Sequence, residues 1–184
     1  MRFRFNLDKA LQVLRYFLEA GPTDKVKLMK LVYLADRTHF IAHGVPITGD
    51  RLVAMPYGPV PSATLDAVNG TLSAPRVFQV IHVNDDRVEP RGAAEVDLLS
   101  PDELATLDQV RQAHGAKATW DLVSETHRLP EYAESYVEGT SRLIPYERIA
   151  KHSGNPERFA LDRPVITQTT ATALECPFPV DDDL

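Results

Sequence analysis

The sequence predicts a mainly α protein, a compact multi-helix domain around a buried central helix, with a small β-hairpin. Three observations lead to this prediction. Leucines recur at helical spacing from Leu7 to Leu18, and the segment Leu28–Ala35 is apolar on almost every side of a helix. The segment Arg76–Val83 instead alternates and is rich in β-branched residues, which is typical of a strand.

The first helix is expected from about Asn6 to Ala20, where Gly21-Pro22 ends it. Either Thr23 or Asp24 can cap the second helix, which continues to about Ala42, shortly before Gly44. Because its middle is apolar nearly all round, this second helix is predicted to be the central one.

Three basic residues, Lys27, Lys30 and Arg37, are expected on one side of the central helix and are called the basic strip below. A strip of this kind can meet an acidic partner. The alternative is that it is simply the solvated side of the helix, with the charged ends of the side chains in water.

The segment Val45–Val60 is expected to be a loop with a short extended piece around Leu52–Met55. Residues that precede Pro59 and Pro61 avoid the α region, which argues against a helix here. Pro61 suits the first turn of a short helix that ends near Val68.

The strand Arg76–Val83 is followed by Asn84-Asp85-Asp86, which can turn the chain, and by a return strand Arg87–Glu89. Further on, Ser100 with Glu103 three residues later forms a capping box that starts a helix ending at Gly115. Three shorter helices are expected after it, over about Thr119–His127, Glu131–Val137 and Tyr146–His152.

Periodicity ends near Arg163. We therefore expect a helical domain over residues 1–162 and an extended C-terminal tail over residues 163–184.

The net charge of −6 and the pI near 5.5 disfavour binding to nucleic acid or to anionic membranes. No stretch approaches the ~18 apolar residues of a membrane span, and the N-terminus has no apolar segment of a secretion signal. With Cys176 as the single cysteine, a cytoplasmic location is expected.

Two motifs resemble those of a known family. The first is the helical segment Lys27–Ala35, and the second is Tyr57-Gly58-Pro59-Val60, about two dozen residues later and just ahead of a short helix. At this spacing they are similar to the Panacea domain of bacterial and phage proteins, the SocA-like antitoxin family. Weaker agreement continues through the hairpin, the helix after Ser100 and Leu122–His127, so that the resemblance covers roughly residues 5–152.

This resemblance implies a helix-rich domain that neutralises a toxin encoded by an adjacent gene. SocA-type members of the family resemble adaptors that present their toxin to an energy-dependent protease of the ClpXP type. The partners implied are therefore the cognate toxin and such an AAA+ protease.

The motif Tyr57-Gly58-Pro59-Val60 is the candidate partner-binding segment, together with the basic strip. Glycine and proline make a rigid loop that can present Tyr57 to a partner at little cost in entropy. The alternative is structural: Tyr57 packs on the central helix and the loop only turns the chain.

Other functions are possible in principle. His39 and His43 are four residues apart, so that a metal-dependent hydrolase could use them with Asp36 or Asp50, but no H-E-x-x-H glutamate is present. Ser124 and His127 lack a nucleophile elbow, and Thr126-His127 is expected to satisfy a helix end instead.

A DNA-binding regulator of its own operon would need a basic recognition helix, and the most basic helix here is also the most apolar. We therefore expect a protein-binding protein and not an enzyme, with no catalytic residues, cofactor or metal.

Overall fold

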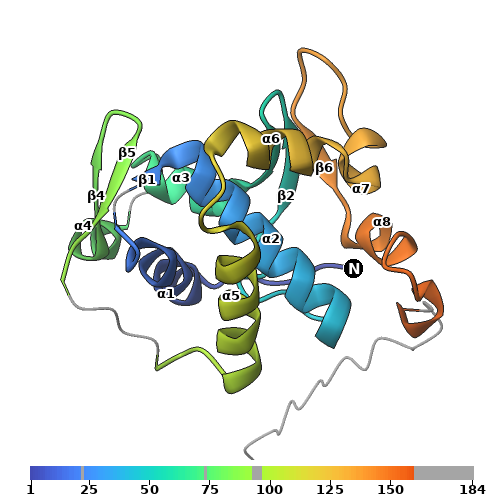
Figure 1. Ribbon diagram of the computed structural model, residues 1–184, viewed down its shortest axis with the longest axis horizontal. Coiled ribbons are helices and arrows are strands. Elements are labelled where there is room, and N and C mark those ends of the chain that lie inside the picture. The colour runs from blue at the N-terminus through green and yellow to red at the C-terminus, as the bar shows by residue number, and fades with distance from the viewer. Residues whose placement is uncertain (22, 73, 93–96, 160–184) are drawn as a thin grey trace, which may run out of the picture.

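The computed structural model describes residues 1–21, 23–72, 74–92 and 97–159. Within these residues the chain forms eight α-helices, a short 3₁₀ helix and two three-stranded antiparallel sheets (Figure 1). The expected helix-rich fold with a hairpin is therefore confirmed in its main features, while a second sheet was not expected. The proposed tail, residues 163–184 including Cys176, lies outside the described residues, and the division into domain and tail stays a prediction.

The first two helices begin as their capping residues predict. Helix α1 (Leu7–Leu18) starts after Asn6, whose side chain accepts a hydrogen bond from the backbone N–H of Lys9. Helix α2 (Lys25–His43) starts after Asp24, which accepts from the N–H of Lys27, so that Asp24 and not Thr23 is the cap. Gly44 ends it with a φ of 81°.

Helix α2 is the central helix, as expected. It contacts helix α1 and four later helices, α3 (Ser62–Val68), α5 (Pro101–His114), α6 (Thr119–His127) and α8 (Tyr146–Lys151), as well as strands β1 (Thr23–Asp24) and β3 (Gly58–Pro61). Figure 1 shows it crossing the middle of the molecule behind α5. Several of its side chains are among the largest that are fully buried: Leu28, Met29, Lys30, Tyr33 and Phe40.

The first sheet has the order β1-β5-β4 and contains the predicted hairpin. Strands β4 (Ile81–Asn84) and β5 (Arg87–Pro90) pair with Val83 opposite Val88, and the two-residue β1 (Thr23–Asp24) joins β5. The strand predicted from Arg76 was wrong in its first half, because Pro75–Val80 forms helix α4. Pro75 at the first turn starts this helix, which packs on α1 and buries Val77.

The second sheet has the order β3-β2-β6. Strand β2 (Leu52–Met55) was expected, but β3 (Gly58–Pro61) was expected to be loop and β6 (Arg142–Ile144) was missed. Proline is compatible with β3 because β3 is an edge strand, where a missing N–H leaves no ladder position unfilled. Val53 pairs with Val60 on one side and with Leu143 on the other.

The remaining helices follow the predicted order. They are α3 (Ser62–Val68), α5 (Pro101–His114), α6 (Thr119–His127), α7 (Pro130–Ala133) and α8 (Tyr146–Lys151), with the 3₁₀ turn Pro156–Phe159 after them.

The capping box is confirmed, since Ser100 and Glu103 exchange hydrogen bonds of 3.2 and 2.8 Å. Helix α7 is shorter than expected. After it, the N–H groups of Ser135 and Tyr136 both donate to the carbonyl of Tyr132. Gly139, with a φ of 73°, then redirects the chain. In the described part of the chain, no helix is long and apolar enough to cross a bilayer.

Leu31 tests the central role of α2, because its side chain is 3% exposed within the core. We expect Leu31→Ala to lower the free energy of unfolding by about 2–5 kcal/mol through lost burial and a residual cavity. Urea denaturation measures this value. Leu143→Ala, at a leucine that is 55% exposed, is the control and should cost well under half as much; equal losses would contradict the central position of α2.

Candidate partner-binding site

Lys30 is buried, with 1% of its surface exposed, and so it does not belong to a solvated side of α2. Its Nζ donates a hydrogen bond of 2.9 Å to the carbonyl oxygen of Pro59 on β3. Burial lowers the pKa of Lys30 to about 7, since the charged ammonium loses its hydration there. The side chain therefore ties the central helix to the edge strand of the second sheet.

Gly58 lets the turn between β2 and β3 pack closely against helices α2 and α6. Its φ is +98°, and a Cβ at this position would lie 2.9 Å from Thr126 Oγ1 and 3.1 Å from both His127 Cδ2 and Lys30 Cε. The backbone thus passes where only glycine fits, for conformational and for steric reasons. The two motifs found in the sequence, on α2 and at the turn, are in direct contact.

Helices α6 and α7 hold the same turn from another side. The hydroxyl of Tyr132 donates to the carbonyl of Met55 at 2.9 Å, and the ring of His127 stacks on Tyr132 with centroids 4.8 Å apart. Burial and then the nearby charge of Lys30 lower the pKa of His127, which favours the neutral imidazole. Neither Tyr132 nor His127 was assigned to this site from the sequence, because the contact joins segments about 75 residues apart.

Tyr57 forms the tip of the turn and is 58% exposed. Its ring lies edge-on against Trp120 at the start of α6, with centroids 5.6 Å apart and an interplanar angle of 77°. Trp120 is itself 62% exposed. The structural alternative, in which Tyr57 packs on the central helix, does not account for this exposure or for the ring contact with Trp120. Trp120 was missed, although an isolated tryptophan at a predicted helix start was a usable signal.

An apolar groove of about 380 Å³ lies beside this aromatic pair. It is bounded by α2, the β2–β3 hairpin and α3, and it is lined by Val26, Met29, Met55, Val60 and Leu65 together with Tyr57 and Lys25. Most of its lining is apolar, with Lys25 as a cationic group. The groove can therefore accept apolar side chains of another molecule.

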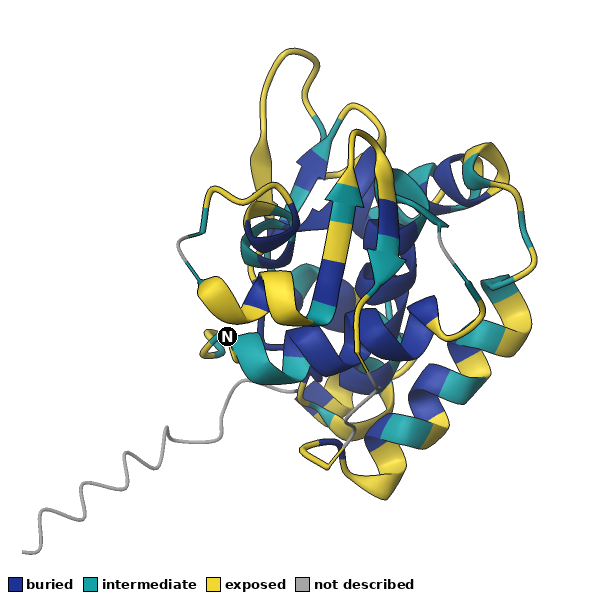
Figure 2. Ribbon diagram, turned by 90° about the vertical axis from the view of Figure 1, so that its left-hand side faces the viewer, coloured by how far each residue is buried: buried dark blue, intermediate teal, exposed yellow. Residues whose placement is uncertain are grey.

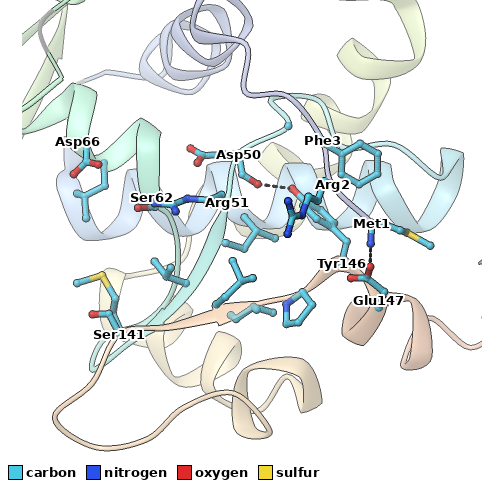
Figure 3. A pocket seen from close by; sticks show the side chains of 18 residues that line it. Met1, Arg2, Phe3, Asp50, Arg51, Ser62, Asp66, Ser141, Tyr146 and Glu147 are labelled. Carbon is cyan, nitrogen blue, oxygen red and sulfur yellow. Dashed lines mark hydrogen bonds and ion pairs between the residues drawn. The ribbon is translucent and has the colours of Figure 1, made fainter. Parts of the chain in front are cut away.

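A larger cleft, called the sheet cleft, adjoins the groove and shares Met55 and Leu65 with it. Its volume is about 910 Å³, and it lies between strands β2 and β6, the N-terminal segment, α3 and α8. Figure 3 shows the N-terminal amino group of Met1 paired with Glu147 at one end. Leu143, 55% exposed, adds apolar surface from β6. Groove and sheet cleft are thus neighbouring hollows with two lining residues in common.

The basic strip is divided by the structure. Lys30 faces inward, and Arg37 pairs through Nε with Oε1 of the fully buried Glu131 at 2.5 Å. The same oxygen of Glu131 accepts from the hydroxyl of Tyr33 at 2.9 Å. Lys27 is half-buried near the start of α2. The expectation of one solvated strip was therefore wrong, because two of the three cations have partners within the fold.

The histidine pair does not assemble a ligand set with the two aspartates. His39 Nδ1 donates to the carbonyl of Val45 at 2.7 Å and its ring stacks on His43. Asp36 accepts from the backbone N–H of Thr48 at 2.8 Å, while Asp50 accepts from the N–H groups at the start of α3. No group of three or more potential metal ligands occurs among the residues that the structure describes.

The hydroxyls of α6 serve the helix itself. Ser124 Oγ donates to the carbonyl of Trp120 at 2.9 Å, and Thr126 Oγ1 donates to that of Leu122 at 2.8 Å. Thr126 thus bonds back to a carbonyl inside α6, and Nε2 of His127 is buried without a hydrogen-bond partner, so that the expectation that Thr126-His127 satisfies the helix end is not confirmed.

The fold and this surface define a small helix-rich domain with a rigid, aromatic-tipped turn beside an apolar groove. The family described as "Antitoxin SocA-like, Panacea domain" matches residues 28–132, more than half of the 184-residue chain. The chain belongs to this family, and its role is in general terms that of an antitoxin. The matched segment runs from α2 to α7 and thus includes every residue that holds the turn. No curated protein and no solved structure gives a significant match to the chain.

Gly58→Ala tests the close contact of the turn with α2 and α6. The new Cβ would meet three side chains while also sitting at a φ that disfavours alanine. Gly139→Ala is the matched control, since its φ is +73° and nothing lies within 4 Å of a Cβ there. We expect Gly58→Ala to cost about 1–3 kcal/mol more than the control in urea denaturation, as over-packing does. Equal costs would show that the turn can move away freely.

Two buried groups with large pKa shifts, Asp36 and Lys30, predict how stability depends on pH. Asp36 has its pKa raised from 3.8 to about 7, so that its contribution to stability falls as pH rises from about 4 to 7. Lys30 has its pKa lowered from 10.5 to about 7, so that the penalty for burying its charge disappears as pH rises from 7 to about 10.

The free energy of unfolding should therefore decrease between pH 4 and 7, and the decrease should be smaller in Asp36→Asn. It should rise between pH 7 and 10 in a part that Lys30→Met removes, each slope approaching about 1.4 kcal/mol per pH unit. If the unfolding free energy of Asp36→Asn between pH 4 and 7, and that of Lys30→Met between pH 7 and 10, changed with pH as in the parent, the assignment of these groups would be wrong.

Proposed function

We propose that this protein is an antitoxin that binds and neutralises a cognate toxin protein encoded by an adjacent gene, and that it acts by binding and not by catalysis. Membership of the antitoxin-like family supports the general role. The observation that carries the binding surface is the exposed Tyr57–Trp120 pair on a fixed turn beside an apolar groove.

The physical basis is preorganisation. A backbone held by Lys30, Tyr132 and the close contacts of Gly58 loses little conformational entropy when a partner binds. Tyrosine and tryptophan are enriched among the residues that dominate binding energy at protein interfaces, and they do so next to pockets that exclude water. The aromatic pair supplies such anchors, and the groove supplies such a pocket.

The residues of the candidate segment then take different roles. Tyr57 contacts the toxin, while Gly58, Pro59 and Val60 fix the turn and one wall of the groove. In the basic strip, Lys30 supports the turn from inside and Arg37 holds Glu131. Lys27, together with Lys25 at the groove, contributes positive charge that favours an acidic patch on the toxin.

Neutralisation is proposed to proceed by delivery of the bound toxin to a ClpXP-type protease, as the SocA-like members of the family imply. Simple occlusion of the toxin is the competing outcome. The two are distinguished by the half-life of the toxin in cells with and without the protease, since only delivery makes the toxin short-lived. The most basic helix, on which a DNA-binding role would depend, is the buried α2.

Rescue of cells that carry the neighbouring toxin gene tests the surface. Co-expressed wild type should restore growth, and Tyr57→Ala and Trp120→Ala should each weaken toxin binding by roughly 30-fold, the equivalent of about 2 kcal/mol. Lys27→Glu should act mainly through slower association that depends on salt.

Phe78→Ala is the matched control, because Phe78 is 57% exposed and lies on α4, in an element that does not line the groove. Circular dichroism and thermal unfolding must first show that each variant is folded. If folded Tyr57→Ala and Trp120→Ala bind as tightly as Phe78→Ala, the toxin does not bind at the turn.

A further inference from the structure

A third cavity, called the arginine pocket, lies between α1, α4 and the chain that follows β5. It has a volume of about 590 Å³. Figure 2 views the molecule from the side that carries α4 and the β4–β5 hairpin. The pocket shares no lining residue with the groove or the sheet cleft, and its lining includes three arginines, Arg15, Arg76 and Arg91.

Arg15 is the unusual member of this set. Its side chain extends from α1 and is 7% exposed, so that the guanidinium is almost entirely out of water. Its Nη2 donates to the carbonyl of Gly92 at 2.8 Å. Its Nε and Nη1 are buried without a hydrogen-bond partner, and Arg15 forms no ion pair with a carboxylate of the described residues.

A buried cation in this state is costly. Removing a charged group from water without a counter-charge carries a penalty of several kcal/mol, and each buried donor left unpaired adds to it. The guanidinium group of an arginine side chain is a permanent cation. An anion bound in the pocket next to the guanidinium would supply the missing counter-charge.

The other charges of the pocket are compatible with an anion. Arg76 pairs with Asp8 at 2.8 Å, so that the carboxylate of Asp8 is already engaged. Arg91 donates to the carbonyl of Phe78 at 3.1 Å and contacts His82. Among the lining residues that the structure describes, Asp97 is the second carboxylate, so that three guanidinium groups stand against two carboxylates there. The remaining lining combines apolar side chains, Leu11, Val80 and Leu98, with two amides, Gln12 and Gln79.

We propose that the arginine pocket binds a small organic anion, a carboxylate or a phosphate monoester, with its charged group on Arg15. Planar guanidinium donors match the oxygens of both groups. The volume of the pocket falls in the range of small-molecule sites, and its apolar part accommodates the uncharged portion of such a ligand. This site is independent of the toxin-binding surface proposed above.

The full chain is titrated with sodium phosphate and, separately, with sodium malonate, while chloride is adjusted to keep the ionic strength constant. Backbone amide chemical shifts by NMR report binding. Saturable shifts are expected for residues of α1 and α4, with at least one of the two anions. Stronger shifts with phosphate would indicate a phosphate ester as the natural ligand, and stronger shifts with malonate a carboxylate.

Arg15→Met should abolish saturation, and Arg91→Gln should raise the Kd at least tenfold. Arg91 is exposed, so that this variant keeps the test decisive if Arg15→Met does not fold. Arg142→Gln, at an exposed arginine on β6, is the control and should bind like the parent. The absence of saturable shifts with both anions, or an unchanged Kd in Arg91→Gln, would overturn the proposal.

Discussion

The hydrogen bond from the ammonium of Lys30 to the carbonyl of Pro59 connects the hydrophobic centre of the molecule to its candidate binding surface. Burial of a charged lysine at this position costs free energy because the ammonium loses its hydration, and the lowered pKa of Lys30 reflects this cost. The bond nevertheless fixes an edge strand that has two prolines and therefore few N–H groups with which to pair. Because Gly58 next to it admits no side chain, the turn has one position relative to α2 and α6.

The consequence of this arrangement is a surface whose shape is set before a partner arrives. Tyr57 is exposed, whereas the residues that follow it are buried and hold its backbone in place. The same hairpin lines the groove beside Tyr57, and Met55 lines both the groove and the neighbouring sheet cleft. A fixed aromatic anchor, an adjoining apolar recess and a long contact surface are the features by which small domains bind other proteins tightly.

The arginine pocket is built on a different balance of forces. There the fold leaves a permanent positive charge buried and incompletely paired, whereas at the turn every buried cation has a partner within the chain. The surface thus has two regions of distinct chemistry. The groove at the turn is mainly apolar, and the arginine pocket is lined by several charged side chains. Since the groove and the arginine pocket share no lining residue, a substitution in one removes no side chain from the other.

The sequence by itself determined the features that depend on neighbouring residues. The capping box at Ser100 and the apolar run of α2 each depend on residues close together in the chain, and both were predicted, while Asp24 was one of two predicted caps of α2. The family also followed from two short motifs. Only the tertiary structure decided that Lys30 is buried, that prolines lie in edge strand β3 of a sheet whose other edge is the distant β6, and that Trp120 contacts Tyr57. These features arise from contacts between residues far apart in the chain, whose burial and pairing are not encoded in local periodicity.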